Sequence, residues 1–115
     1  MNKYHQFLMR AAIIDASHEA TRRIDLLAKK LLEIIAVTDS MGIPMTVGDV
    51  MKISALASPA TLHRKIDMLR EAELIDMIFI GKNRRTKYLI PTDLANDYFS
   101  KMGKAVLKSL NSSVL

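Results

Sequence analysis

Cysteine is absent from this chain of 115 residues. Disulfides, thiolate nucleophiles and cysteine-based zinc sites are therefore excluded, and such a composition suits a reducing compartment. Long apolar runs are also missing: the stretch 31–37 is interrupted by Glu33 and falls short of the roughly 20 residues that cross a bilayer. Arg10 interrupts the apolar run 7–9, so no signal peptide is expected. We therefore predict a cytoplasmic protein with no membrane partner.

Half of the residues are apolar and a quarter are charged, as in ordinary soluble globular proteins. The length predicts one domain, residues 1–115. The net charge of +5 is unevenly distributed: residues 1–57 carry seven Lys and Arg against six Asp and Glu, whereas residues 58–115 carry ten against six. A local excess of positive charge attracts phosphate, so nucleic acid is the partner that this distribution favours.

Helical periodicity dominates both ends of the chain. Residues 2–14 are predicted to form an amphipathic helix, and residues 17–40 a longer helix central to the core. Gly42 and Pro44 then stop that helix, because Gly suits the position just past a helix end and Pro cannot continue one. After Pro91, Thr92 is predicted to cap a final helix with a broad apolar stripe.

Between these ends, the signals predict two short helices and a hairpin. Thr46 and Asp49 resemble a capping box, which starts a helix over 47–53. Ser58 as N-cap and Pro59 at the first helical position start the next helix, over 59–72. Residues 74–80 and 86–90 predict two strands joined by a basic, glycine-containing turn. The predicted fold is mainly α with a small β-hairpin wing: an N-terminal helix in 1–20, a winged helix-turn-helix core in 21–91 and a C-terminal helix in 92–110.

The helix opened by Ser58 has two faces. Leu62, Ile66 and Leu69 are predicted to face the core. The outward residues at its N-terminal half are candidate DNA contacts because such a helix places that half nearest the base edges. They are Ser58, Ala60, Thr61, Arg64 and Lys65. Arg64 can contact guanine O6 and N7 with two hydrogen bonds. The alternative is that this is only the polar outer face that any globular domain presents.

The hairpin tip carries the other candidate contacts. Arg84 and Arg85 are predicted to enter the minor groove, with Lys82 and Lys87 on phosphates and Asn83 beside them. The alternative is a solvated tip that charge keeps soluble.

Two runs resemble the MarR-type winged-helix transcriptional regulators: residues 58–75, at the position of their recognition helix, and Pro91-Thr92-Asp93-Leu94-Ala95, where the wing leads into the dimerisation helix. The resemblance covers roughly residues 20–110 and implies a homodimer, often a repressor, that binds duplex DNA selectively. It implies base and phosphate contacts at Ser58, Ala60, Thr61 and Arg64 and a wing-tip arginine at Arg85. Asn83 stands where an acidic residue commonly supports that arginine. The chain is shorter than typical members, so no small-molecule effector is expected.

Apolar stripes on the first and last helices predict that these helices form a dimer interface, because a winged helix alone cannot cover both. The candidate interface residues are Phe7, Leu8, Leu94, Tyr98, Phe99, Met102 and Val106. The alternative is that the two helices pack on each other within one chain.

An enzyme is not expected, because the sequence has no glycine-rich phosphate loop and no nucleophile motif, and His5, His18 and His63 are far apart. Asp15, His18 and Glu19 share a turn, but such a group is more often incidental than a metal site, so neither a metal nor a cofactor is predicted. The alternative function is a winged-helix module that binds a protein, or DNA without sequence preference, within a nucleoprotein complex.

Overall fold

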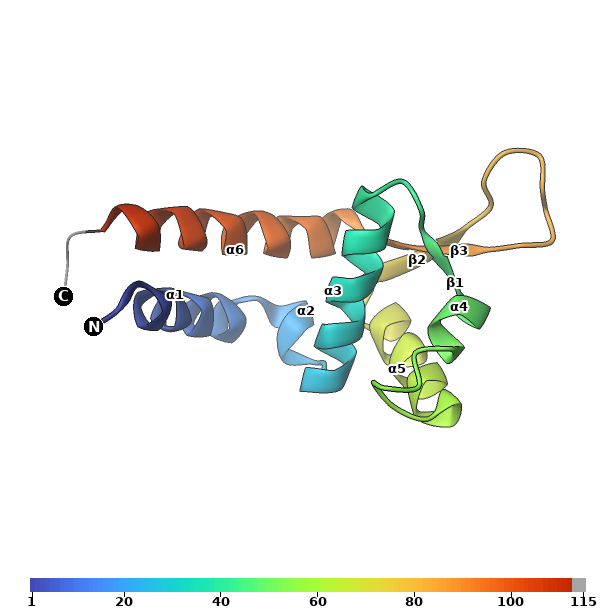
Figure 1. The fold of residues 1–115 in the computed structure, drawn as a ribbon, viewed down its shortest axis with the longest axis horizontal. Helices are drawn as coiled ribbons and strands as arrows, with labels where there is room; N and C mark the ends of the chain where they lie inside the picture. Colours follow the sequence, from blue (N-terminus) through green and yellow to red (C-terminus); the bar gives the residue numbers. More distant parts are fainter. Residues whose placement is uncertain (113–115) are drawn as a thin grey trace.

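The computed structural model describes residues 1–112 and shows a mainly helical chain with a small antiparallel sheet (Figure 1). The elements in chain order are α1 (Lys3–Ser17), α2 (Glu19–Arg22), α3 (Leu26–Ser40), β1 (Met45–Thr46), α4 (Val47–Met51), α5 (Pro59–Glu71), β2 (Ile75–Ile78), β3 (Tyr88–Pro91) and α6 (Asp93–Asn111). The sheet order is β1-β3-β2, with both pairings antiparallel. This is the arrangement of a winged helix to which a pair of long helices is attached.

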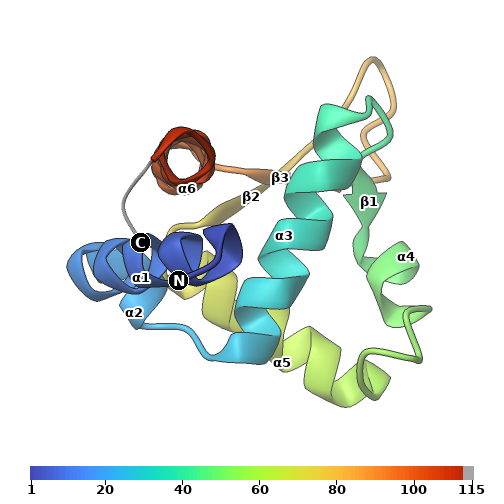
Figure 2. The same ribbon diagram turned by 60° about the vertical axis from the view of Figure 1, so that its left-hand side comes forward.

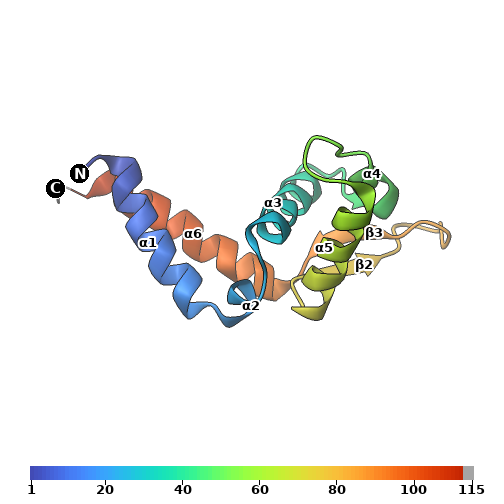
Figure 3. The same ribbon diagram turned by 90° about the horizontal axis from the view of Figure 1, so that it is seen from below.

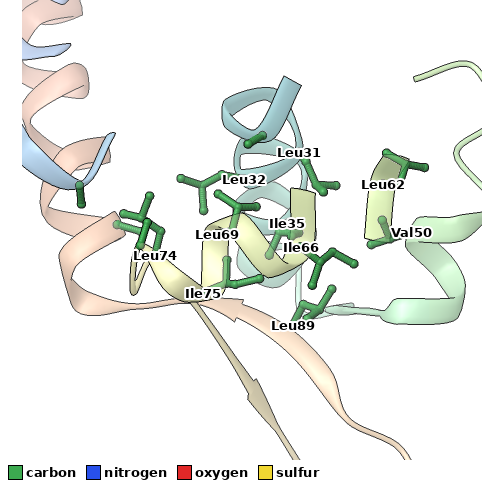
Figure 4. Packing of buried hydrophobic residues seen from close by; sticks show 14 residues of the cluster. Leu31, Leu32, Ile35, Val50, Leu62, Ile66, Leu69, Leu74, Ile75 and Leu89 are labelled. Atoms are coloured by element: carbon green, nitrogen blue, oxygen red, sulfur yellow. The ribbon is translucent and has the colours of Figure 1, made fainter. Parts of the chain in front are cut away.

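The core lies between α3, α5 and the sheet (Figure 4). The three apolar residues predicted to face inward from α5, Leu62, Ile66 and Leu69, are buried, as are Leu31 and Ile35 of α3. Each such side chain contributes roughly 1.5–3 kcal/mol by leaving water. The burial of this one face fixes which face of α5 remains at the surface.

Local capping signals set most helix ends as predicted. Thr46 and Asp49 form a reciprocal capping box, and the Ser58 and Thr92 side chains each accept a hydrogen bond from the third amide of the following helix. Gly42 has a φ of 80° after α3, and its amide donates to the Asp39 carbonyl. Ile43 donates to Thr38, which completes the hydrogen-bond pair of a glycine-terminated helix.

The single helix predicted over residues 17–40 is wrong. The chain forms α2 and α3 instead, separated at residues 23–25. Asp25 is the cause: its side chain accepts a hydrogen bond from the Ala28 amide at 2.8 Å, so it starts a new helix where periodicity predicted continuation. Similarly, the His18 side chain accepts from the Thr21 amide and caps α2, and the His18 backbone amide donates to the Ile14 carbonyl at the end of α1. The break turns the chain, so that α3 lies between the α1–α6 pair and α4 (Figure 2).

The hairpin is shorter than predicted, and the sheet has one strand more. β2 and β3 pair from Ile75 opposite Pro91 to Ile78 opposite Tyr88, so residues 79–87 form a loop instead of extending both strands. The unpredicted β1 pairs with the other edge of β3. A strand of two residues leaves too little periodicity to be seen in a sequence, and only its partner defines it.

The end of α5 is joined to the start of α6. Glu73 follows the helix in the left-handed region at a φ of 60°. Its carbonyl accepts a hydrogen bond from the Thr92 hydroxyl at 2.8 Å, and the Thr92 amide donates to the Leu74 carbonyl. Thr92 therefore caps α6 and also holds that helix against the C-terminal end of α5.

α1 and α6 lie side by side in opposite directions and form an arm that extends away from the winged core (Figures 1 and 3). The arm makes the molecule elongated, with extents of 52 × 29 × 25 Å. Tyr98 is 1% exposed within this pair. The packing of the two helices within one chain, left open by the sequence, is therefore what the structure shows. Within residues 1–112, none of the helices combines the length and apolar character needed to cross a bilayer.

Three elements meet at Asp15, near the base of the arm. Its carboxylate accepts from the Tyr98 hydroxyl of α6 at 2.6 Å and from the Lys29 ammonium of α3 at 2.7 Å. Burial alone would raise the pKa of Asp15, but the hydrogen bonds from Lys29 and Tyr98 outweigh it and hold that pKa below its ordinary value. Burial and the bond to Asp15 raise the pKa of Tyr98, which keeps its hydroxyl protonated. This contact ties the arm to the core.

Candidate nucleic-acid interface

The first turn of α5 presents a linked group of polar side chains at the surface. The Arg64 guanidinium donates to Thr61 Oγ1 at 3.1 Å, and Ser58 Oγ donates to the same atom at 3.0 Å. Ser58 Oγ also accepts from the Thr61 amide. Ser58 and Arg64 are exposed and Thr61 is partly exposed. The structure therefore brings together three of the residues predicted to contact DNA.

Ala60 completes this surface with its backbone. Pro59 has no amide proton, and the Thr61 amide already donates to Ser58. The Ala60 amide is thus the N–H of the first turn that can reach a phosphate placed at the end of the helix. Its methyl side chain is exposed and small, so it allows close approach of another molecule to the helix.

Lys65 lies apart from this group. Its ammonium is 2.5 Å from the Asp25 carboxylate, and its side chain is only 18% exposed. Hydrogen bonds, first from Lys65 and then from the Ala28 amide, lower the pKa of Asp25. The structure thus places Lys65 as a link between α5 and the start of α3, which differs from the outward position predicted for it.

The wing carries its positive charge around an aromatic ring. The Arg84 guanidinium carbon is 5.5 Å from the centroid of Phe79, and the Lys87 ammonium is 5.6 Å from it. Both distances fit a cation on the face of a ring. Lys82, Arg84, Arg85 and Lys87 are all exposed. Phe79 was missed as a site residue because the sequence assigned it to a strand; an aromatic residue just before a basic run is the signal that marks it.

Asn83 supports the wing through the backbone. Its side-chain oxygen accepts from the Arg85 amide at 2.8 Å, and its amide nitrogen donates to the Thr86 hydroxyl at 3.3 Å. These are the bonds of a turn closed by a side chain. An asparagine thus orders the loop locally, at the position where the resemblance implied an acid facing the arginine side chain.

The wing loop and the start of α5 lie at the end of the molecule opposite the free ends of α1 and α6 (Figure 1). A hollow separates the loop from the start of α4, with Thr46, Val47 and Gly48 on one side and Arg84, Arg85 and Lys87 on the other. The candidate contacts therefore form one end of the protein, with the arm at the other.

The predicted interface residues of the arm occupy three different environments. Leu8 and Val106 are exposed, and Phe7, Phe99 and Met102 are half-buried. Leu94 is exposed beside the hollow next to His18, at the base of the arm. Tyr98 was wrongly predicted to be an interface residue, because its side chain is already buried inside the chain.

The acidic and histidine side chains near the α1–α2 junction each bind a different partner. Asp15 is bound to Lys29 and Tyr98, Glu19 pairs with Arg23, and His18 accepts from the Thr21 amide. Residues 1–112 contain no group of three or more His, Asp or Glu side chains placed to hold a metal ion.

The chain thus has a winged-helix arrangement with an added two-helix arm. No protein-family model matches it, and no curated protein is similar to it. A solved structure with the same fold is the crystal structure of RV1404 from Mycobacterium tuberculosis, with a TM-score of 0.63 and 21% sequence identity. The match covers 90% of this chain and 65% of that one, so the chain spans about two thirds of the length of RV1404. At this identity the likeness establishes the fold alone.

Proposed function

We propose that this protein is a transcriptional regulator of the MarR type, a non-enzymatic homodimer that binds duplex DNA at selected sites and acts as a repressor. The observation that carries the proposal is the hydrogen-bonded group of Ser58, Thr61 and Arg64 at the exposed N-terminal turn of α5. This is the part of a recognition helix that comes nearest the base edges in the major groove. The basic wing at the same end of the molecule supports it.

Each element has its own part in this mechanism. Arg64, held by Thr61, donates to guanine O6 and N7, while the Ala60 amide and Ser58 take a phosphate at the helix end. Arg84 and Arg85 of the wing lie along the adjacent minor groove, with Lys82 and Lys87 on its phosphates. Lys65 has no direct contact; by pairing with Asp25 it sets the position of α5 against α3.

The homodimer rests on the apolar side of the arm. Val106 and Leu110 are one helical turn apart and both exposed on α6, and Tyr4 and Leu8 are equally spaced and exposed on α1. A second copy that covers this side places two α5 helices on one duplex. Such a dimer reads a near-palindrome whose half-sites are about one helical turn apart.

The test is enrichment of a randomised duplex library on the purified protein at about 150 mM salt, followed by sequencing. A two-fold symmetric motif, bound about 10³-fold or more above random duplex, is the expected result. Retention without a motif would replace the proposal with non-specific DNA binding. Absence of retention would favour a winged helix that binds protein.

A further inference from the structure

The arm has a second, chemically different side. An open groove of about 330 Å³ runs between α1 and α6. It is lined by Arg10, Ile13, Ile14, Lys101, Lys104, Ala105 and Lys108. Three of these residues are aliphatic, four are cationic, and none is acidic. An apolar floor with charge of one sign at the rim fits a molecule that combines an apolar chain with an anionic group.

Two of the four cations are already engaged. The Arg10 guanidinium donates to Ser109 Oγ at 3.0 Å across the two helices, and Lys101 is 3.1 Å from the Asp97 carboxylate on its own helix. Lys104 and Lys108 lie one turn apart on α6, both exposed, and neither has an ion pair within residues 1–112. These two ammonium groups are therefore the ones available to a ligand's negative charge.

The apolar part of the groove is only partly covered by the rest of the chain. The Ile13 side chain is 67% exposed, next to half-buried Ile14 and buried Ala105. Exposure of this branched aliphatic side chain to water is unfavourable, and a ligand chain that covered it would remove that cost. The three aliphatic side chains form no hydrogen bonds, so they select for an aliphatic chain, whereas the lysines select for the negative charge.

The size and charge of the groove decide which occupant fits. A second copy, related by a two-fold axis, would place Lys104 and Lys108 opposite the same cations, which is unfavourable. An amphipathic helix, about 10 Å wide with its side chains, would extend well beyond the hollow. A volume of 330 Å³ is at the lower end for small-molecule sites, which favours one small ligand with a single aliphatic chain.

We propose that this groove binds a medium-chain acyl carboxylate, with its carboxylate between Lys104 and Lys108 and its chain along Ile13, Ile14 and Ala105. The site is independent of the DNA-binding proposal, because it lies on the arm, away from α5 and the wing (Figure 3).

The test is calorimetric titration of the whole chain with decanoate below its micelle concentration. Decanol and decyltrimethylammonium supply the same chain without charge and with the opposite charge. We expect one decanoate per chain, and at least tenfold weaker binding of both controls. Lys104→Glu with Lys108→Glu should weaken decanoate binding at least tenfold, with the helical circular dichroism unchanged. Lys82→Glu with Lys87→Glu, the same charge change in the wing, should leave it intact.

Equal binding of decyltrimethylammonium, or an unaltered decanoate affinity in the Lys104 and Lys108 variant, would overturn the assignment. A third result would also overturn it: light scattering that shows a dimer for the wild type and a monomer for the Lys104 and Lys108 variant. The groove would then be an interface between two copies of the chain. The two proposals can fail separately. If the wild-type protein binds decanoate but no DNA, only the proposed function is contradicted. If the Lys104 and Lys108 variant loses decanoate but keeps DNA binding, the groove is shown to be separate from the DNA interface.

Discussion

At the first turn of α5, the Thr61 hydroxyl accepts hydrogen bonds from the side chains of Ser58 and Arg64. Each of the three residues has a distinct role in this arrangement. Ser58 ends the preceding loop by capping the helix, Thr61 accepts from both neighbours, and Arg64 is held through Thr61 in an orientation away from the core. An arginine held in this way loses less side-chain entropy on binding than one that is free in solvent. The capping signal and the candidate reading residue therefore depend on each other.

Arg64→Ala should weaken binding at the preferred site by about 1–3 kcal/mol and relax selection at one base pair, because it removes a bidentate contact to guanine. Arg70→Ala is the matched control: it removes the same charge from the C-terminal half of the same helix, where Arg70 is exposed. Competition binding with single-base variants of the site measures both. Equal discrimination by the wild type and Arg64→Ala would exclude Arg64 from base reading.

At the scale of elements, the wing combines order at its base with charge at its tip. Asn83 closes the turn through the Arg85 amide, and Phe79 holds two cations over its ring. The loop can therefore keep several positive charges close together, where an unsupported loop would spread them apart. Such a wing suits phosphate contact, whose strength depends on the number of charges that reach the backbone.

Arg84→Ala with Arg85→Ala should weaken binding to all duplexes alike and flatten its salt dependence. A monomer that neutralises about four to six phosphates should show a slope of log affinity against log salt near −4 to −5, and the double variant a smaller one. Arg22→Ala with Arg23→Ala removes two exposed arginines near the arm and should leave the slope unchanged. A wild-type slope in the wing variant would place the wing off the DNA.

The elements differ in how far the sequence could predict them, and the reason is the range of the interactions that define them. Ser58, Thr46 and Thr92 could be assigned as caps because each bonds to an amide three residues away. The break at residues 23–25 was missed because the apolar period continues across it. β1 and the roles of Lys65 and Tyr98 depend on partners far along the chain. Two parts of the candidate site could be predicted from neighbouring residues alone: the outward face of α5, from its apolar spacing, and the exposed basic wing, from its run of lysines and arginines.

The contact at Asp15 joins three elements, and its electrostatics predict a response to acid. Because the pKa of the folded state lies below the ordinary 3.8, the ionised carboxylate stabilises the fold above about that pH. This contribution is lost as the pH falls through the lowered value. Asp15→Asn keeps the size of the side chain but removes the charge. Its urea midpoint should therefore fall less than that of the wild type between pH 6 and pH 3. The control is Asp76→Asn, at an exposed residue of β2 outside this contact, whose midpoint should fall as that of the wild type does.

At the scale of the whole molecule, the arm separates two surfaces that a single winged helix would not have. α1 and α6 bury one face of each other, which leaves an apolar side and a cation-rimmed groove on the two flanks of the pair. The amount of exposed apolar side chain distinguishes the two. Tyr4, Leu8, Val106 and Leu110 are exposed on one flank, whereas the groove exposes mainly Ile13 among its apolar residues. The first flank is therefore the better candidate for covering by a second copy.

Val106→Glu should convert a dimer into monomers, because two copies related by a two-fold axis would each bring a buried carboxylate into an apolar contact. Val106 is a sharper test than Phe99, since its side chain is 44% exposed within the chain and the substitution leaves the core intact. Met41→Glu, at a residue 64% exposed in the α3–β1 loop, is the matched control and should keep the wild-type mass. Light scattering at several concentrations measures the mass. A dimer that persists in Val106→Glu would move the interface away from this side of the arm, and a wild-type monomer at all concentrations would remove the homodimer and its palindromic site together.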